Sequence, residues 1–229
     1  SFKKYFEGIK AVTKESIKVS LQSDIDFENI LITTVGRDWL PNNKLKITGG
    51  ALNSRLLTFF NDDNLKPTKS YIRQSLFNVI NIDNNMICLD LFCGSGILAA
   101  ESISRGLKKA VLVESNLKTC KNIIDEFANL KINNYEIIPI SVFSFIKNQK
   151  NKSYDIIFID APFHTNDLSK TLKMLDEYGF LIENQFIYIE QNKKDYNQEL
   201  VSIISKTHNI VKDLSMGDVS YTIAKKRDK

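Results

Sequence analysis

The stretch M-I-C-L-D-L-F-C-G-S-G, residues 86–96, decides the fold. Its first six residues form an apolar run of the length of a buried strand, interrupted only by Asp90. Gly94 and Gly96 break this run at once, and an apolar helical segment begins at Ile97. A strand, a glycine turn and a helix in this order present backbone N–H groups to a nucleotide at the helix N-terminus.

Asp90 indicates which kind of nucleotide would bind. The glycine spacing differs from the G-x-G-x-x-G of dinucleotide-binding proteins, and a carboxylate so close to the turn would repel a pyrophosphate. S-adenosylmethionine (SAM) has no phosphate, and its methionine part carries an ammonium and a sulfonium. We therefore expect this stretch to bind SAM as a cofactor.

Apolar runs alternate with helical patterns along the rest of the chain. Strands are expected at residues 86–91, 110–113, 135–140, 154–160, 186–190, 201–204 and 219–224. Helices are expected after an N-cap at Ser70, from Ile97 to a C-cap at Gly106, at 117–130, after a Ser141 cap through 146, and from Asp167 to about Gly179. This alternation predicts an α/β fold with a mostly parallel sheet, and the two last strands, which flank Gly217, predict an antiparallel edge.

The composition excludes several classes of protein. With 43% hydrophobic residues in 229, the chain can build a core and is not disordered. A net charge of +4 permits a nucleic-acid partner without requiring one. Three cysteines without C-x-x-C spacing and two histidines argue against a metal site, and no apolar run has the length of a membrane span.

The N-terminal part divides into two pieces. Residues 1–43 are mixed and charged, with possible short strands at 17–21 and 30–35, and we treat them as an extension of unknown role. A hairpin-like element, residues 44–66 with Gly49-Gly50 at its turn, then opens the main domain, residues 44–229.

Glu114 ends the second strand of the main domain. In parallel sheets, ligands lie beyond the carboxyl ends of the central strands, and a carboxylate at the end of the second strand can bind ribose hydroxyls. A glutamate at a strand end is ordinary by itself. After this glycine turn, we expect it to bind the nucleoside.

The motif D-A-P-F, residues 160–163, ends another apolar strand. The Asp160 carboxylate and the Ala161 carbonyl, held by Pro162, can accept both N–H groups of an exocyclic amine on a base. Phe163 can stack on that base, which must leave its own stack to enter. No strong base is needed, because the nitrogen can lose its proton after the methyl arrives. Alone, the motif would be interpreted as a strand followed by a proline turn, with Phe163 in the core; the functional interpretation depends on its combination with the glycine turn and Glu114.

Further motifs occur in the same order as in a known family. They are K-I-T-G-G-A-L-N-S-R-L-L at 46–57, K-P-T-K-S-Y-I-R-Q-S-L-F-N at 66–78, and G-x-V-x-Y at 217–221. Together with the glycine turn and D-A-P-F, they resemble the RsmD family over about residues 45–225. Members of this family are bacterial SAM-dependent methyltransferases that modify a guanine N2 of small-subunit ribosomal RNA.

The resemblance implies a Rossmann-like class I methyltransferase fold, with seven strands and helices on both faces of the sheet. It implies that SAM is bound by Asp90, Phe92, Gly94, Gly96, Glu114, Ser115, Ser141 and Val142. It places catalysis at Asp160, Ala161, Pro162 and Phe163. It assigns RNA contacts to Lys46, Arg55, Arg73 and Phe163. The expected partner is small-subunit ribosomal RNA or the assembling small subunit, with no membrane and no metal, and the free protein is expected to be a monomer in the bacterial cytoplasm, or alternatively in a mitochondrion or plastid.

Departures from the family leave alternatives open. Ala161 replaces a proline, and Asn53 and Ser54 stand where the family hairpin is basic and rich in glycine. Fewer cations weaken phosphate binding. One alternative is a protein that has lost turnover and serves as a ribosome assembly factor or ribosomal component. Another is an enzyme for adenine N6 in nucleic acid, since D-A-P-F alone does not separate the two bases.

Overall fold

The structure is a computed structural model that describes residues 43–59, 67–150, 152–163, 165–182, 184–195 and 198–227. They belong to one compact unit, Leu40–Lys229. The expected strands at 17–21 and 30–35, the rest of the extension up to residue 42, and residues 60–66 of the hairpin-like element lie outside the described residues.

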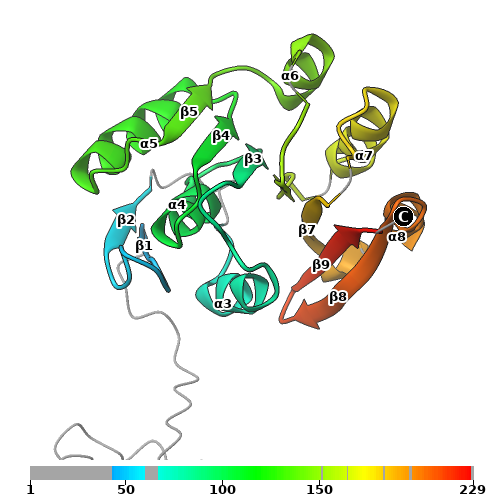
Figure 1. The fold of residues 1–229 in the computed structure, drawn as a ribbon, viewed down its shortest axis with the longest axis horizontal. Helices are drawn as coiled ribbons and strands as arrows, with labels where there is room; N and C mark the ends of the chain where they lie inside the picture. Colours follow the sequence, from blue (N-terminus) through cyan, green and yellow to red (C-terminus); the bar gives the residue numbers. More distant parts are fainter. Residues whose placement is uncertain are drawn as a thin grey trace, which may run out of the picture. The chain divides into compact units, whose positions relative to one another are not determined.

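Within the described residues, seven strands form one sheet (Figure 1). They are β3 (Ile87–Leu91), β4 (Lys109–Val113), β5 (Tyr135–Ile138), β6 (Ile156–Ile159), β7 (Phe186–Asn192), β8 (His208–Met216) and β9 (Val219–Lys226). Their order is β5-β4-β3-β6-β7-β9-β8. The five strands β3 to β7 run parallel, and β9 is antiparallel to both of its neighbours. The predicted fold is confirmed. The antiparallel strand is β9, which is the second strand from the edge of the sheet; the edge strand itself is β8.

Helices cover both faces of the sheet. They are α3 (Ser70–Val79), α4 (Ile97–Ser104), α5 (Leu117–Asn129), α6 (Val142–Asn148), α7 (Asp167–Glu177) and α8 (Gln198–Ser205), with a short 3₁₀ helix at Lys193–Asp195. Apolar side chains of α3, α4 and α5 pack with Phe158 and Tyr188 on one face. Those of α6, α7 and α8 pack with Ile157 and Ile187 on the other. Successive strand residues point to opposite faces, which is why both neighbours in each pair are buried.

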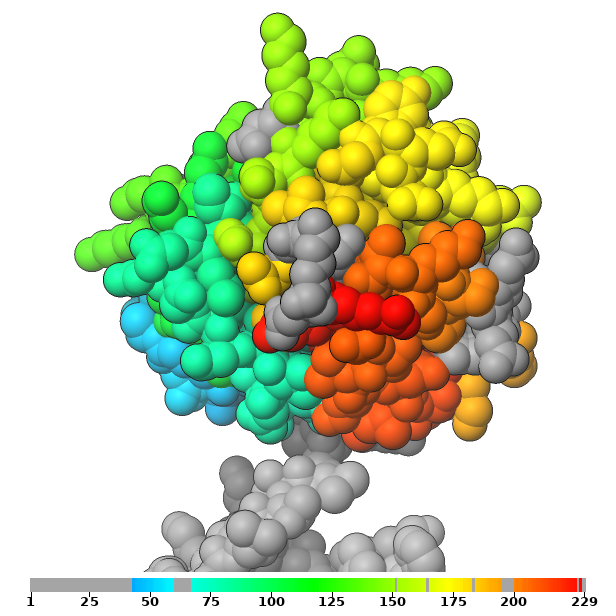
Figure 2. Space-filling view, turned by 45° about the vertical axis from the view of Figure 1, so that its right-hand side comes forward, coloured from blue at the N-terminus to red at the C-terminus, as the bar shows by residue number. Residues whose placement is uncertain are grey.

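The segment 201–204 is a helix and not the expected strand. It lies within α8, which buries Leu200 and Ile204 four residues apart, the spacing of one helix face. A short apolar run does not distinguish a buried helix from a strand, and here the helix packs on the sheet face. The strand on the outer side of β9 is β8, whose side chains are mostly exposed. Figure 2 shows β8 at the surface beside α3, where the Lys212 ammonium donates to the Ser75 hydroxyl at 2.7 Å.

Several of the expected helix boundaries are shifted by one or two residues; α5 ends at Asn129 and α6 at Asn148, where residues 130 and 146 were expected. Lys69 occupies the N-cap of α3 in place of Ser70, and it offers no capping side chain. Arg105 is the C-cap of α4, and Gly106 follows it with a φ of 104°. The predicted cap at Ser141 is confirmed, because its hydroxyl accepts from the Ser144 N–H at 3.2 Å.

The predicted hairpin is also confirmed. β1 (Lys44–Lys46) and β2 (Leu56–Thr58) pair antiparallel. Its turn lies on the end of α4, where the Ala51 N–H donates to the Ser104 carbonyl at 2.6 Å. Gly50 has a φ of 77°, and a Cβ at this position would lie 1.9 Å from the Ser104 carbonyl oxygen. Only glycine fits such a close approach of two backbones.

Candidate cofactor and substrate site

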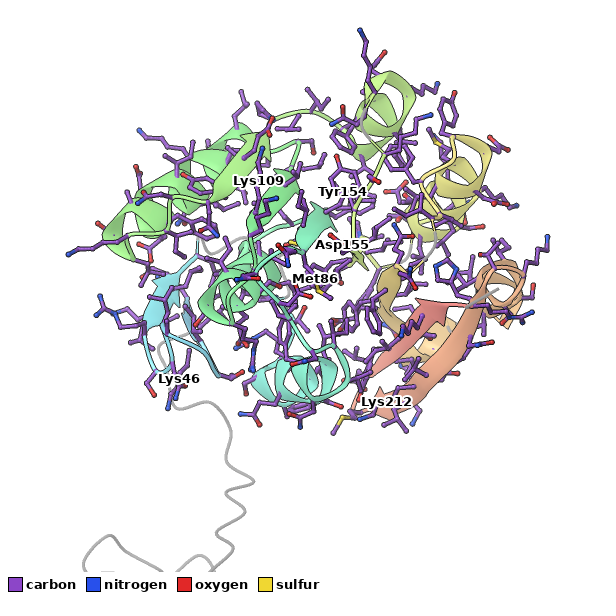
Figure 3. The ribbon with its side chains drawn as sticks, in the orientation of Figure 1. Lys46, Met86, Lys109, Tyr154, Asp155 and Lys212 are labelled. Atoms are coloured by element: carbon purple, nitrogen blue, oxygen red, sulfur yellow. The ribbon has the colours of Figure 1, made fainter. Side chains whose placement is uncertain are left out.

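The carboxyl ends of the central strands define the candidate site. In Figure 3, Met86, Lys109 and Asp155 mark the opposite ends, where β3, β4 and β6 begin. Asp90 lies near the carboxyl end of β3, and Asp160 follows β6 directly. Because β3 and β6 are parallel neighbours, the glycine turn and the D-A-P-F motif both lie at the carboxyl ends of the strands, as predicted.

The glycine turn is built from left-handed backbone. Phe92, Gly94 and Gly96 have φ values of 58°, 50° and 72°. The Cys93 N–H donates to the Val113 carbonyl at 3.2 Å, which fixes the turn to the end of β4. Gly96 is the N-cap of α4, so the first N–H groups of the helix point toward the strand ends.

Glu114 lies directly against this turn. Its carboxylate accepts from the Gly94 N–H at 3.2 Å and from the Asn116 N–H at 2.8 Å. Each oxygen can accept further hydrogen bonds, so a ribose hydroxyl could still bind. Ser115 beside it is exposed. The acidic residue and the glycine turn thus form one unit, as a nucleoside site requires.

Asp90 is a buried carboxyl group with an unused acceptor. Its side chain is 1% exposed, and its Oδ2 has no hydrogen-bond partner among the described residues. Burial raises the pKa of Asp90 to about 8, a hydrogen bond from the Ala99 backbone opposes this, and the charge of Glu114 adds to it. An unpaired buried carboxyl group fits a cationic ligand, and the ammonium of SAM has the required charge.

The raised pKa gives a testable pH dependence. Between about pH 4 and 8 the folded protein binds more protons at Asp90 than the unfolded chain, so this group makes folding less favourable as pH rises. A cationic ligand favours the ionised form. SAM affinity of the wild type is therefore expected to rise with pH up to about 8, by at most about tenfold per pH unit.

Asp90→Asn tests this assignment. Calorimetry is expected to show loss of SAM binding, whereas thermal unfolding at pH 8 is expected to show stability at least equal to that of the wild type. Undiminished binding by the variant would show that Asp90 does not hold the cofactor.

An aromatic pair lies near the predicted adenine contacts. Phe92 meets Phe143 of α6 edge to face, with 6.4 Å between ring centroids. Ser141 uses its hydroxyl to cap α6, and the Val142 side chain is buried in the core. Only the backbone of Val142 is therefore available to a ligand. The sequence analysis did not identify Phe143, since an aromatic residue in a short helix carries no specific signal.

The D-A-P-F motif lies beside a pocket. Ala161, Pro162 and Phe163 line a volume of about 280 Å³, together with Glu190 from β7 and Leu200 from α8. Ala161 is buried, Pro162 is exposed, and Phe163 is partly buried against the core. Among the described residues, the lining includes neither Asp160 nor the glycine turn, so the pocket adjoins the D-A-P-F motif without reaching the predicted cofactor contacts.

Asp160 has neighbours that the sequence analysis missed. The Thr68 hydroxyl donates to the Asp160 carboxylate at 3.3 Å. Glu190, at 3% exposure, accepts from the Tyr188 hydroxyl at 2.7 Å. Burial and the charges of Glu190 and Asp90 raise the pKa of Asp160 well above its usual value. A glutamate at the end of a fifth strand gave no signal, but the register of β6 and β7 would have placed it beside Asp160.

The predicted RNA contacts divide into two groups. Lys46 and Arg55 are exposed on the hairpin, and Figure 3 shows Lys46 at its surface. Arg73 is 1% exposed, and its Nε donates to Glu101 at 2.7 Å. Its guanidinium also binds the carbonyls of Thr68 and Lys46. The expectation that Arg73 contacts RNA was wrong, because this side chain is used inside the protein.

The described part of the chain shows no group of three or more His, Cys, Asp or Glu residues that could hold a metal. Within the same residues, no helix is long and apolar enough to cross a membrane. The three cysteines are free and buried.

Comparison with known proteins gives a family and several relatives. The family model described as Conserved hypothetical protein 95 matches residues 45–225. Ribosomal RNA small subunit methyltransferase D of Buchnera aphidicola subsp. Acyrthosiphon pisum is 41% identical over 154 residues, which are 67% of this chain and 81% of that protein. The protein of the same name from Escherichia coli K12 is 32% identical over 150 residues, covering 65% of this chain and 75% of that one.

A solved structure agrees with these matches. An Escherichia coli protein described as a presumed methyltransferase superimposes with a TM-score of 0.68 at 28% identity, covering 81% of this chain and 99% of that chain. A more distant structure, 17% identical with a TM-score of 0.63, covers 81% of this chain and 57% of that one, and it contains S-adenosylhomocysteine (SAH). At that identity the likeness concerns the fold alone.

Proposed function

The chain belongs to the RsmD family of SAM-dependent methyltransferases, and we propose that it methylates the exocyclic N2 of a guanine in small-subunit ribosomal RNA. The observation that carries the proposal is the position of Asp160 at the same sheet edge as the glycine turn with its unpaired Asp90. Asp90 and the glycine turn are suited to a cationic cofactor, and Asp160 is suited to accept hydrogen bonds from an amine beside it.

The cofactor would be held by three groups. Asp90 would pair with the ammonium, the turn at Gly94 and Gly96 would let the cofactor approach the backbone closely, and Glu114 would accept hydrogen bonds from the ribose hydroxyls. Phe92, Ser115, Ser141 and the backbone of Val142 would contact the adenine. When bound, SAM supplies a methyl group on a positively charged sulfur.

The target amine is oriented by the D-A-P-F motif. The Asp160 carboxylate and the Ala161 carbonyl accept its two N–H groups, which directs the nitrogen lone pair toward the methyl. Pro162 holds the carbonyl in place, and Phe163 stacks on the base. The rate then comes mainly from alignment of the reacting atoms, an effect that can be worth several powers of ten.

The proposed partner is small-subunit ribosomal RNA, free or in an assembling subunit. Lys46 and Arg55 on the exposed hairpin are suited to phosphate contacts. The free protein is proposed to be a monomer. Relatives named above are bacterial, which favours the bacterial cytoplasm over a mitochondrion or plastid.

A methylation assay tests the proposal directly. Purified small ribosomal subunits that lack the modification are incubated with the protein and labelled SAM, and the modified nucleoside is identified by mass spectrometry. N2-methylguanosine is the expected product, while N6-methyladenosine would show a different target base. Binding of subunits without any methyl transfer, by protein that binds SAM, would favour the assembly-factor alternative.

A further inference from the structure

Glu190 is a buried carboxyl group to which the mechanism above gives no role. Ile159 of β6 and Ile189 of β7 are direct neighbours in the sheet, so the next residues, Asp160 and Glu190, emerge side by side. Both point to the face that carries Phe158 and Tyr188. Glu190 is 3% exposed, and Asp160 is partly buried.

Few donors serve these two carboxyl groups. The Thr68 hydroxyl donates to Asp160 at 3.3 Å, and the Tyr188 hydroxyl donates to Glu190 at 2.7 Å. Each hydroxyl has a single proton, and the Thr68 hydroxyl lies within reach of both carboxyl groups, so its proton serves only one of them at a time. Among the described residues, no lysine or arginine forms an ion pair with either carboxyl group. Two neighbouring carboxyl groups with so little compensation oppose each other's ionisation, so the pair holds a proton to higher pH than an isolated carboxyl group would.

Some of the surrounding groups raise the pKa values of Asp160 and Glu190, and others lower them. Burial raises the pKa of Asp160 and of Glu190, and the charge of Glu190 raises the pKa of Asp160 further. Asp90 on β3 adds to this effect. Hydrogen bonds from Tyr188 and Thr68, with the charges of Lys69 and Arg73, lower the pKa of Glu190. Tyr221 of β9 lies next to Tyr188, with 6.2 Å between ring centroids.

We propose that Glu190 is a positioning residue for the transfer: with Asp160 it forms a pair that holds one proton, releases it when the cationic cofactor binds, and takes up the proton that the methylated amine loses. Glu190 acts through Asp160, which contacts the amine. The inference rests on the proposed function and deepens it.

The step balances in atoms and charge. The nitrogen lone pair forms the new N–CH3 bond while the S–CH3 bond breaks, and its electron pair stays on sulfur. The positive charge thereby moves from sulfur to nitrogen. The N–H bond facing Asp160 then breaks, its electron pair stays on nitrogen, and the proton goes to the carboxylate. The pair ends in the singly protonated form that it has in the protein alone.

Proton release on ligand binding gives a readout that does not depend on activity. Calorimetry of the same titration in two buffers of different ionisation enthalpy reports the protons released. SAM and SAH share the ammonium that faces Asp90, and only SAM has the sulfonium. We expect wild-type protein to release more protons with SAM than with SAH, and Glu190→Gln to abolish most of this difference.

Two variants are expected to shift the pH–rate profile in opposite directions. In single-turnover methylation, the rate falls at low pH as the pair becomes protonated. Glu190→Gln removes the like charge and should move this acid limb down by about one pH unit. Tyr188→Phe removes a donor that favours ionised Glu190 and should move it up. Glu136→Gln, on the edge strand β5 and half-exposed, is the matched control and should leave the limb in place.

The outcomes separate this inference from the proposed function. Wild-type protein that neither binds SAM nor methylates would overturn both. Active wild type with an equal proton release for SAM and SAH, or an acid limb that Glu190→Gln does not move, would overturn the inference alone. If Glu190→Gln does not fold, Tyr188→Phe provides the test: an acid limb of its pH–rate profile at the wild-type position would overturn the inference.

Discussion

Replacing Asp160 by alanine is expected to lower the rate of methyl transfer by about 100-fold or more, because an amine that is no longer oriented leaves the line of attack. Affinity for SAM should change much less than the rate, since Asp90 and Glu114, which are proposed to bind its ammonium and ribose, stay in place. The measurement is single-turnover methylation of small subunits with saturating protein, beside calorimetry with SAM. A variant with normal rate would remove Asp160 from the mechanism.

The control for this variant is Asp125→Ala. Asp125 is exposed on α5, away from the candidate site. Replacing it by alanine therefore removes the same side-chain charge as Asp160→Ala without changing the site. Its rate should stay within about twofold of the wild type, as surface substitutions away from special features are nearly neutral. A similar loss in both variants would mean that net charge, rather than orientation of the amine, limits the reaction.

Arg73→Met is expected to lower the free energy of unfolding by about 3–5 kcal/mol, because it leaves the Glu101 carboxylate buried without its main cation. Glu101 is 0% exposed and accepts from Arg73 at 2.7 Å and from the Thr48 hydroxyl at 2.7 Å. Arg105 lies farther from it, at 3.5 Å. For a chain of this size the loss corresponds to a drop in Tm of roughly 10 °C, measurable by calorimetry or circular dichroism.

Lys109→Ala provides the comparison for this ion pair. Lys109 and Glu136 also lie 2.7 Å apart, but their side chains are 43% and 51% exposed. Exposed pairs contribute about 0–1 kcal/mol, so this variant should unfold close to the wild type. If Arg73→Met and Lys109→Ala lowered the free energy of unfolding equally, burial would not explain why one ion pair matters more for stability than the other.

The parts of the fold that were predicted correctly carry their signal locally. The run ending in Asp90, the breaks at Gly94 and Gly96, and the cap at Ser141 depend on neighbours in the sequence. The helix at 201–204 was missed because its apolar run is too short to distinguish two periods. β8 was missed because an edge strand has one partner and leaves most of its side chains exposed, so its sequence shows no continuous apolar run.

The site residues that were missed depend on contacts between distant segments. Thr68 meets Asp160 across 92 positions of the chain, and no local pattern indicates this. Arg73 looked like an RNA contact because its charge is visible in the sequence, whereas its buried partner Glu101 is 28 positions away. Burial and pairing of charges are tertiary properties, and a single sequence does not contain them directly.

The position of β9 between β7 and β8 has a consequence for synthesis. The ribosome makes β7 before β9, so the outer edge of β7 stays open until residues up to Lys226 have left the exit tunnel. During that interval the backbone of the strand carrying Glu190 can pair with any other exposed strand. Slow translation of the C-terminal hairpin would therefore prolong the period in which the nascent chain can aggregate.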